Sequence, residues 1–349
     1  MGCEKAFSVK ARNMSAIAAL AVVVIHAGNG DMGSFAAKAL HQFLAWGLCT
    51  FAVPWFFFAS GYFFAGHLDE KGWWRHSLKT RLRTLALPYI MWCSLFVCFS
   101  IVINMFFNAR AGNALLADLT LSKSFFCGFG LDISKHPMLV PFWYIRALLV
   151  IVLVSPILVY ALRRWGWGVP LVIVPAYVYC CGVHNRYAMP WFLFYSPFPL
   201  AGWLYFSVGV LARLDKWECR KCRVPTWLCW AIALPIICVG RLSLYKGLPV
   251  VANCLWIASI PILLLGVWRL VPWQAMPSWL VASAFPIYVM HYFFELALES
   301  SILPLRSSYL WTYLSRIGVV AIFSIFVANI LRTSFPRISG ILFGGRLRL

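Results

Sequence analysis

The stretch SAIAALAVVVIHAG, residues 15–28, reads as a membrane-spanning helix that carries one histidine, His26, close to its end. A helix needs about 20 mostly apolar residues to cross the hydrocarbon core, and the apolar run over residues 13–29 approaches that length. An ionisable side chain in hydrocarbon costs about 2.5–3.5 kcal/mol for the charged types on insertion scales. We therefore expect His26 to have a chemical role or a polar partner.

The composition of the whole chain agrees with a membrane protein. Of 349 residues, 62% are hydrophobic and only 11% are charged, with a mean hydropathy of +0.82. A soluble protein carries about 25% charged residues, so this chain lacks the polar side chains that a water-exposed surface needs. The net charge of +20 does not indicate nucleic-acid binding, because the basic residues are confined to short stretches between apolar runs. The composition predicts an all-α, polytopic membrane protein.

Apolar runs predict about ten transmembrane helices in a single domain over residues 1–349. Lysines and arginines number twenty on one side of this arrangement and eight on the other, which predicts that both termini are in the cytoplasm. We expect a multi-pass protein of the cell inner (plasma) membrane. We expect short tails over about 1–11 and 333–349 and an external loop over about 108–141. The ten predicted spans cover approximately residues 13–29, 44–65, 84–107, 142–162, 167–183, 194–212, 226–240, 251–270, 279–298 and 312–332.

The first helix also carries a cation at its cytoplasmic end. Arg12 and His26 are fourteen positions apart, which leaves them within about 40° on one helix face, with His26 roughly 20 Å deeper. A neutral imidazole accepts a proton from an alcohol or attacks a thioester, so His26 suits a general base or a nucleophile. The alternative is a structural histidine that is hydrogen-bonded to a carbonyl of a neighbouring helix.

Two further stretches combine an apolar helix with functional side chains. FAVPWFFFASGYFFAG, residues 51–66, places Ser60 and Tyr62 among aromatic residues, although its small residues equally favour close helix packing. HSLKTRLRTLALPY, residues 76–89, places Lys79, Arg81 and Arg83 before an apolar run. Such a cluster suits the phosphates of coenzyme A, or it reflects the ordinary excess of cations on the cytoplasmic side.

Two apolar stretches in the rest of the chain contain titratable residues. VPFWYIRALLVIVLVSPIL, residues 140–158, adds Trp143 and Arg146 to the candidates. SAFPIYVMHYFFELALES, residues 283–300, carries His291, Glu295 and Glu299 at spacings of four, so all three share one helix face. His291 and Glu295 could hydrogen-bond to each other, and Arg146 could need a carboxylate partner.

Five motifs, in order, resemble the acyltransferase-3 family of integral membrane O-acyltransferases. The family pattern is a first helix ending VVxxH, then VPxFFxxSGY, a basic cluster before LLxPY, WFLRxL with SPIL, and a late FxIYLLH. The matching stretches are VVVIHA (22–27), VPWFFFASGYFF (53–64), KTRLRTLALPY (79–89), FWYIRALLVIVLVSPIL (142–158) and FPIYVMH (285–291).

The resemblance implies transfer of an acyl group, usually acetyl from cytosolic acetyl-CoA, to a hydroxyl of an envelope carbohydrate or lipid-linked sugar. It places the catalytic histidine at His26 and the basic cluster at Arg81 and Arg83, with Lys79; the arginine of the WFLRxL stretch corresponds to Arg146. Acetyl-CoA would be the acyl-donor substrate, and no metal is expected. The chain departs from the pattern at Ser15, where the family commonly has arginine, and Arg12 lies one turn earlier on the same face.

A function of a different class stays open on the sequence alone. A transporter or flippase of a glycolipid or small organic substrate also has many spans and buried charges along its path. A repeat of two halves would have favoured a transporter, and the sequence shows none. Substrate movement across vesicles without dependence on acetyl-CoA would distinguish it from an acyltransferase.

Overall fold

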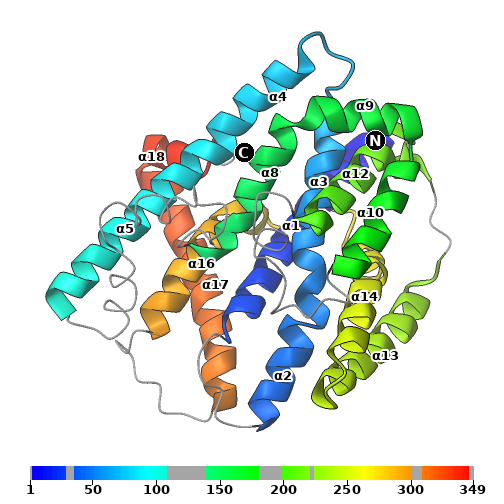
Figure 1. Ribbon diagram of the computed structural model, residues 1–349. Helices are drawn as coiled ribbons and strands as arrows, with labels where there is room; N and C mark the ends of the chain where they lie inside the picture. The colour runs from blue at the N-terminus through cyan, green and yellow to red at the C-terminus, as the bar shows by residue number, and fades with distance from the viewer. Residues whose placement is uncertain are drawn as a thin grey trace.

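The computed structural model describes residues 2–28, 35–107, 139–180, 199–220, 224–299 and 309–345, and within these ranges it contains helices and no strand. The long helices form a bundle (Figure 1). Helices satisfy their own backbone hydrogen bonds, as lipid surroundings require. The elements are α1 (Cys3–His26), α2 (Phe35–Ala45), η1 (Leu48–Phe51), α3 (Ala52–Ala65), α4 (Trp73–Arg81), η2 (Leu82–Ala86), α5 (Leu87–Phe107), η3 (Val140–Phe142), α8 (Trp143–Leu153), α9 (Ser155–Trp165), α10 (Gly168–Val178), α12 (Leu200–Leu214), η5 (Trp217–Cys219), α13 (Thr226–Tyr245), α14 (Pro249–Leu270), α15 (Ser278–Val281), α16 (Ala284–Glu299), α17 (Tyr309–Ser334) and α18 (Pro336–Leu342).

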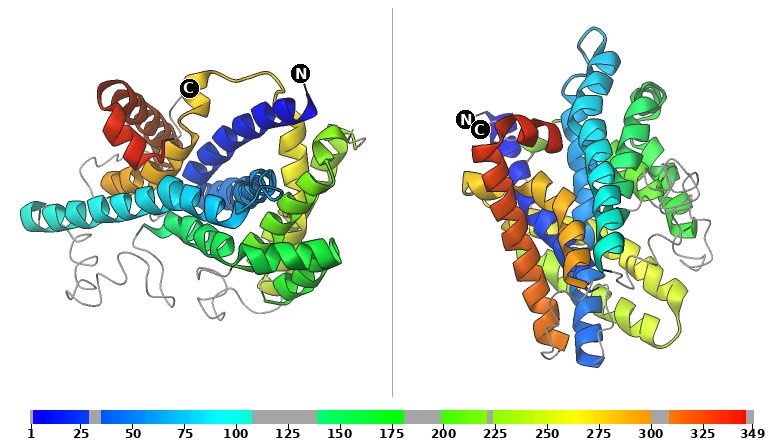
Figure 2. Two further views of the ribbon diagram at one scale, coloured as in Figure 1. Left: turned by 90° about the horizontal axis from the view of Figure 1, so that it is seen from above. Right: turned by 90° about the vertical axis from the view of Figure 1, so that its left-hand side faces the viewer.

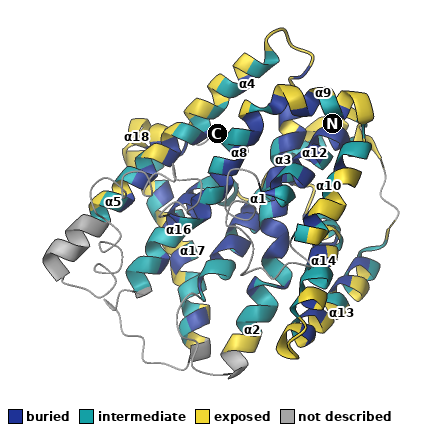
Figure 3. Cartoon of the chain, in the orientation of Figure 1, coloured by how far each residue is buried: buried dark blue, intermediate teal, exposed yellow. Residues whose placement is uncertain are grey.

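The first helix, α1, lies in the buried centre of the bundle and packs against α3 and α16 (Figures 1 and 3). Its contact faces are rich in small side chains, and Ala16, Ala18 and Ala19 are fully buried. Small residues let helix backbones approach closely, which membrane proteins use because lipid supplies little hydrophobic driving force between helices. The apolar stretch at residues 15–28, which predicted the first span, therefore lies in the core of the bundle.

Glycines hold α3 against α12. A Cβ added at Gly61 would lie 2.1 Å from the Phe206 carbonyl oxygen, and one added at Gly209 would lie 2.1 Å from the Phe58 carbonyl oxygen. These are backbone atoms, so a side chain at either position would force the two helices apart. Of the adjacent pair Ser60 and Gly61, the glycine has the packing role.

Within the described ranges, six helical segments are long and apolar enough to cross a membrane, and a seventh span is possible if α8 and α9, bent by 68° at a short break, count as one. Three shorter apolar helices lie at Gly168–Val178, Leu200–Leu214 and Ala284–Leu298. Each predicted span overlaps a helical segment, but about ten crossings stays a prediction. The six segments are Cys3–His26, Lys38–Ala65, Trp73–Phe99, Thr226–Tyr245, Pro249–Leu270 and Trp311–Ser334.

Two helices extend into the stretches predicted as tails. The helix predicted from residue 13 begins at Cys3, because Phe7 is buried against the rings of Tyr62 and Trp268, at 4.2 and 5.0 Å. The predicted C-terminal tail contains α18, and the Trp92 indole donates a hydrogen bond to the Leu342 carbonyl at 3.0 Å. Most of the predicted external loop, residues 108–138, lies outside the described residues.

The beginning of α1 and α18 lie at the same end of the bundle (Figure 2). Two ends on one side fit the even number of crossings that the distribution of lysines and arginines predicts. Which side of the membrane they face stays a prediction from that distribution.

Candidate active site

His26 is the last residue of α1, and its ring faces two aromatic side chains of α16. The centroid of the His26 ring lies 5.2 Å from that of His291 and 5.5 Å from that of Tyr292. His26 is partly buried, whereas His291 is fully buried. The two histidines, 265 positions apart in the sequence, meet because α1 and α16 pack along their lengths.

The hydrogen bonds of His291 define its tautomer. Its Nδ1 lies 2.7 Å from the Tyr288 carbonyl oxygen and 3.2 Å from the Ile287 carbonyl oxygen. Carbonyl oxygens only accept, so Nδ1 carries the hydrogen and Nε2 has the free lone pair. Nε2 is buried and has no hydrogen-bond partner among the residues that the structure describes. His291 thus offers a buried acceptor beside His26.

The predicted alternative, a hydrogen bond between His291 and Glu295, does not form. The Nδ1 of His291 donates to carbonyls of its own helix instead, and its Nε2 makes no hydrogen bond within the described ranges. Glu295 is buried one turn further along α16, on the face that the spacing predicted. Glu299 lies at the end of the helix.

A third histidine, which the sequence analysis missed, lies near His26. His41 is on α2, and its ring hydrogen-bonds to the backbone of Ile25. The same ring packs against Gly28, where an added Cβ would lie only 2.3 Å from a His41 ring atom. The His41 ring also meets Tyr313 edge-on at 5.4 Å. No motif marked His41, because a lone histidine near the start of an apolar run resembles an interfacial residue.

A cavity of about 530 Å³ lies beside α1, and we call it the donor cavity after the acyl-donor site that the sequence predicts. Arg12 and Arg81 both line it, so the structure brings these two predicted phosphate-binding residues together. Ser15, where the family commonly has arginine, lines the same cavity and accepts a hydrogen bond from the Trp55 indole at 3.0 Å. Three further polar side chains in its lining are Ser60, Tyr144 and Tyr288.

The basic cluster divides between the cavity and the surface. Arg81 is partly buried and lines the cavity, whereas Lys79 and Arg83 are exposed and do not line it. Residues two positions apart on a helix point to different faces, so an alternating pattern cannot place all three cations in one site. The cluster lies within one continuous helical segment, Trp73–Phe99, with a π-helical stretch at Leu82–Ala86, so the helix begins before the cluster and not at the apolar run that follows it.

Ser60 and Tyr144 form the polar wall of the donor cavity. The Tyr144 hydroxyl donates to the Phe56 carbonyl at 3.2 Å and lies 3.1 Å from the Ser60 hydroxyl. Trp143, the residue before Tyr144, packs against Phe57 at 6.2 Å between ring centroids and does not line the cavity. The motifs alone did not predict which way the Ser60 and Tyr144 hydroxyls point.

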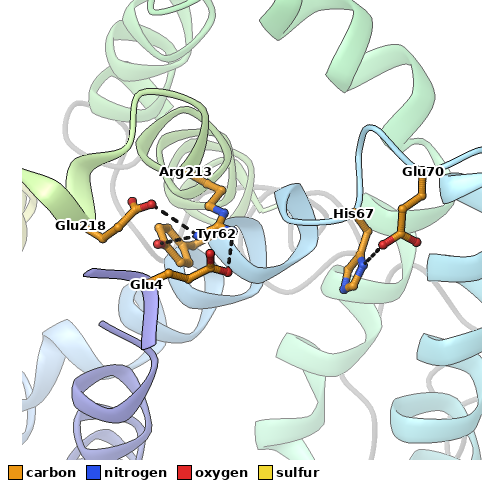
Figure 4. A network of polar contacts seen from close by, with 6 residues as sticks. All are labelled: Glu4, Tyr62, His67, Glu70, Arg213 and Glu218. Carbon is orange, nitrogen blue, oxygen red and sulfur yellow. Dashed lines mark hydrogen bonds and ion pairs between the residues drawn. The ribbon is translucent and has the colours of Figure 1, made fainter. Parts of the chain in front are cut away.

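Arg146 and Tyr62 lie outside the donor cavity. Arg146 is partly buried on α8, with its charge near Tyr89. The Tyr62 hydroxyl accepts a hydrogen bond from Arg213 at 3.1 Å, and Arg213 also pairs with Glu4 at 2.5 Å and Glu218 at 3.3 Å (Figure 4). This network fastens the start of α1 to α12 and η5.

Tyr288 lies between the donor cavity and the histidines. It lines the cavity, its ring centroid is 6.1 Å from that of His291, and its hydroxyl donates to the Pro141 carbonyl. His26 does not line the cavity in the described part of the chain. Arg12 and His26, predicted to share one continuous stripe, thus contact different regions, and Tyr288 borders both.

The comparison with protein families agrees with the resemblance. A family model described as an acyltransferase domain matches residues 13–333, nearly the whole chain. No curated protein and no solved structure matches the chain.

Proposed function

We propose, on the premise that this chain belongs to the acyltransferase-3 family and is a membrane acyltransferase, that it transfers acetyl or another short acyl group from cytosolic acyl-CoA to a hydroxyl of an envelope carbohydrate or lipid-linked sugar. The observation that carries the proposal is the shared cavity of Arg12 and Arg81, bordered by Tyr288, whose ring packs against His291. A cationic pocket close to a histidine base suits a thioester donor that carries phosphates.

The donor cavity would hold acyl-CoA from the cytoplasmic side. Arg12 and Arg81 would bind its phosphates, because guanidinium groups form paired, charge-assisted hydrogen bonds with phosphate oxygens. Arg12 would supply the charge that the family commonly places at Ser15. The Ser60 and Tyr144 hydroxyls, on the same cavity wall, would hydrogen-bond to polar atoms of the pantetheine arm.

The thioester end would reach the histidines past Tyr288. The Tyr288 ring borders both the donor cavity and His291, so a rotation of this side chain would join the two regions. Such a gate would keep water from the thioester until the acceptor is bound, which limits wasteful hydrolysis.

His26 would act as the base of the transfer. One ring nitrogen takes the proton of the acceptor hydroxyl while the hydroxyl oxygen bonds to the thioester carbonyl carbon. The carbon–sulfur bond breaks, and the departing coenzyme A thiolate takes that proton from His26. The alternative route, a transient acyl-imidazole at His26, begins with attack of the same nitrogen on the thioester.

His291 would position His26. Its Nε2 is an acceptor without a partner in the described residues, so it suits the N–H of the other His26 nitrogen. A hydrogen bond there would fix the His26 tautomer and leave its reacting nitrogen without a hydrogen, as the orienting residue of a catalytic triad does.

The proposed reaction is tested by comparing envelope glycans of cells with and without the chain. We expect an ester-linked acyl group to disappear from one glycan, as measured by mass spectrometry before and after mild alkali, and to return when the chain is restored. Identical acylation in the two strains, together with acyl-CoA-independent movement of a substrate across vesicles, would favour the transporter instead.

A further inference from the structure

A second cavity, of about 660 Å³, lies against another face of α1. Lys10 of α1 lines it, together with Arg269 of α14 and the indoles of Trp217, Trp268 and Trp273. None of the predicted site residues lines this cavity, and neither does either histidine of the pair. We call it the indole cavity.

The loop after α14 separates the two cavities. Trp273 lines the indole cavity, whereas Met276, three residues later, lines the donor cavity. Asn13 fixes this loop, since its amide nitrogen donates to the carbonyls of Pro272 and Gln274 at 3.0 and 2.8 Å, and its amide oxygen accepts from the Met276 N–H at 3.2 Å. The indole cavity is therefore a distinct site with a fixed wall.

Lys10 is the feature that indicates a ligand. Its side chain is buried, with 2% of its surface exposed, and its Nζ lies over the rings of Trp273 and Trp268, at 4.2 and 4.9 Å from the centroids. No carboxylate lies within salt-bridge distance of Lys10 in the described part of the chain. Indole faces compensate a buried ammonium only in part, because a buried charge normally pairs with an opposite charge.

The charges around the indole cavity favour an anion. Arg269 and Arg220 add two cations to the lining, and the charge of Arg269 repels that of Lys10. Glu218 is the one carboxylate among the lining residues that the structure describes, and it pairs with Arg213 at 3.3 Å. Three cations therefore line the cavity with one carboxylate that already has a cationic partner.

We propose that the indole cavity binds a phosphate ester, with the phosphate held by Lys10 and Arg269 and the adjoining carbon skeleton against the Trp268 and Trp273 rings. This site is separate from the donor cavity and does not rest on the proposed reaction. A free phosphorylated metabolite and the headgroup of an anionic lipid share this chemistry, and the experiment distinguishes them.

The experiment uses the full chain in nanodiscs of phosphatidylcholine, which carries no net charge. In one arm, inorganic pyrophosphate is titrated calorimetrically; in the other, phosphatidylglycerol is added to the nanodiscs and the melting temperature is measured. The variants are Lys10→Met, which keeps the length of the apolar stem, Lys10→Arg, which keeps the charge, and Arg269→Gln. Lys5→Met is the matched control, because Lys5 is an exposed lysine of α1 that lines neither cavity.

We expect Lys10→Met and Arg269→Gln to weaken pyrophosphate binding about tenfold or to abolish the stabilisation by phosphatidylglycerol, since each removes a charge-assisted hydrogen bond. Lys10→Arg and Lys5→Met should retain that binding. If Lys10→Met and Arg269→Gln weaken pyrophosphate binding, the site binds a free phosphate compound. If they abolish the stabilisation by phosphatidylglycerol, the site binds a lipid headgroup. The proposal would be overturned if Lys10→Met responded like the parent in both arms, or if Lys5→Met lost as much binding as Lys10→Met.

Discussion

His26 on α1 faces His291 on α16, with 5.2 Å between their ring centroids. The Nδ1 of His291 is held by two backbone carbonyls, so its Nε2 remains a buried acceptor next to the imidazole at the end of the first helix. This relationship gives His26 a neighbour that can select its tautomer. Packing alone does not explain why this fully buried histidine presents an acceptor nitrogen to His26.

Replacing His291 tests its positioning role. We expect His291→Phe to lower the turnover of acyl transfer about 10²-fold, because a misoriented base costs about that much, with little change in the KM for acyl-CoA. The measurement is steady-state transfer by membranes that contain equal amounts of protein. His67→Gln is the control, since His67 pairs with Glu70 in an exposed turn (Figure 4) and does not line the donor cavity. An unchanged turnover in His291→Phe would remove His291 from the mechanism.

The division of the basic cluster gives a test with controls on the same helical segment. Arg12→Met and Arg81→Met should each raise the dissociation constant for acyl-CoA about tenfold or more, the loss expected for one charge-assisted contact with a phosphate. Lys79→Met and Arg83→Met should have little effect, because these side chains are exposed and do not line the donor cavity. The measurement is the dissociation constant of a non-hydrolysable acyl-CoA analogue for each of the four variants. Equal losses in all four variants would indicate a general surface potential instead of the described cavity.

The close contact of α3 and α12 predicts a steep cost at one glycine. Gly61→Ala should destabilise the protein by about 1–3 kcal/mol, because the added Cβ would lie 2.1 Å from a backbone oxygen. Gly66→Ala, at the end of the same helix, is the matched control, since its nearest atom would lie at 3.5 Å. Thermal unfolding in one detergent compares them. Equal melting temperatures for the two variants would contradict this packing.

The network at the start of α1 predicts a compensating pair of substitutions. Arg213→Met removes a cation from Glu4, Tyr62 and the largely buried Glu218, and should destabilise the protein by about 1–3 kcal/mol. Adding Glu218→Gln to that variant should recover part of the loss, because a neutral amide is easier to bury than an unpaired carboxylate. Melting temperatures of the single and double variants measure the coupling. A double variant less stable than Arg213→Met would show that Glu218 does not depend on Arg213.

The apolar pattern predicted where helices form, since each predicted span overlaps a helical segment. It misplaced ends that depend on tertiary contacts, as at Cys3, where burial of Phe7 extends α1. The break between α8 and α9 was also missed, because the apolar run continues through Val154 and Pro156 while the helix axis turns by 68°. Neither the length nor the hydropathy of an apolar run indicates where the helix axis changes direction.

The candidate site was predictable in its residues but not in its arrangement. His26, His291, Arg12 and Arg81 were all predicted, and the structure places the first two together and the last two together. The border at Tyr288 was not predicted, because it depends on the packing of α16 against the donor cavity. Lys10 was counted only as one cytoplasmic cation, since burial between two indoles leaves no sign in the sequence.

The most direct test of the catalytic role of His26 is acetyl transfer from labelled acetyl-CoA by membranes that contain His26→Ala, with protein abundance measured in the same samples. We expect a loss of about 10²–10⁴-fold, the range for removal of a general base, at normal abundance. Transfer equal to that of the parent would contradict the assignment of His26 as the catalytic residue.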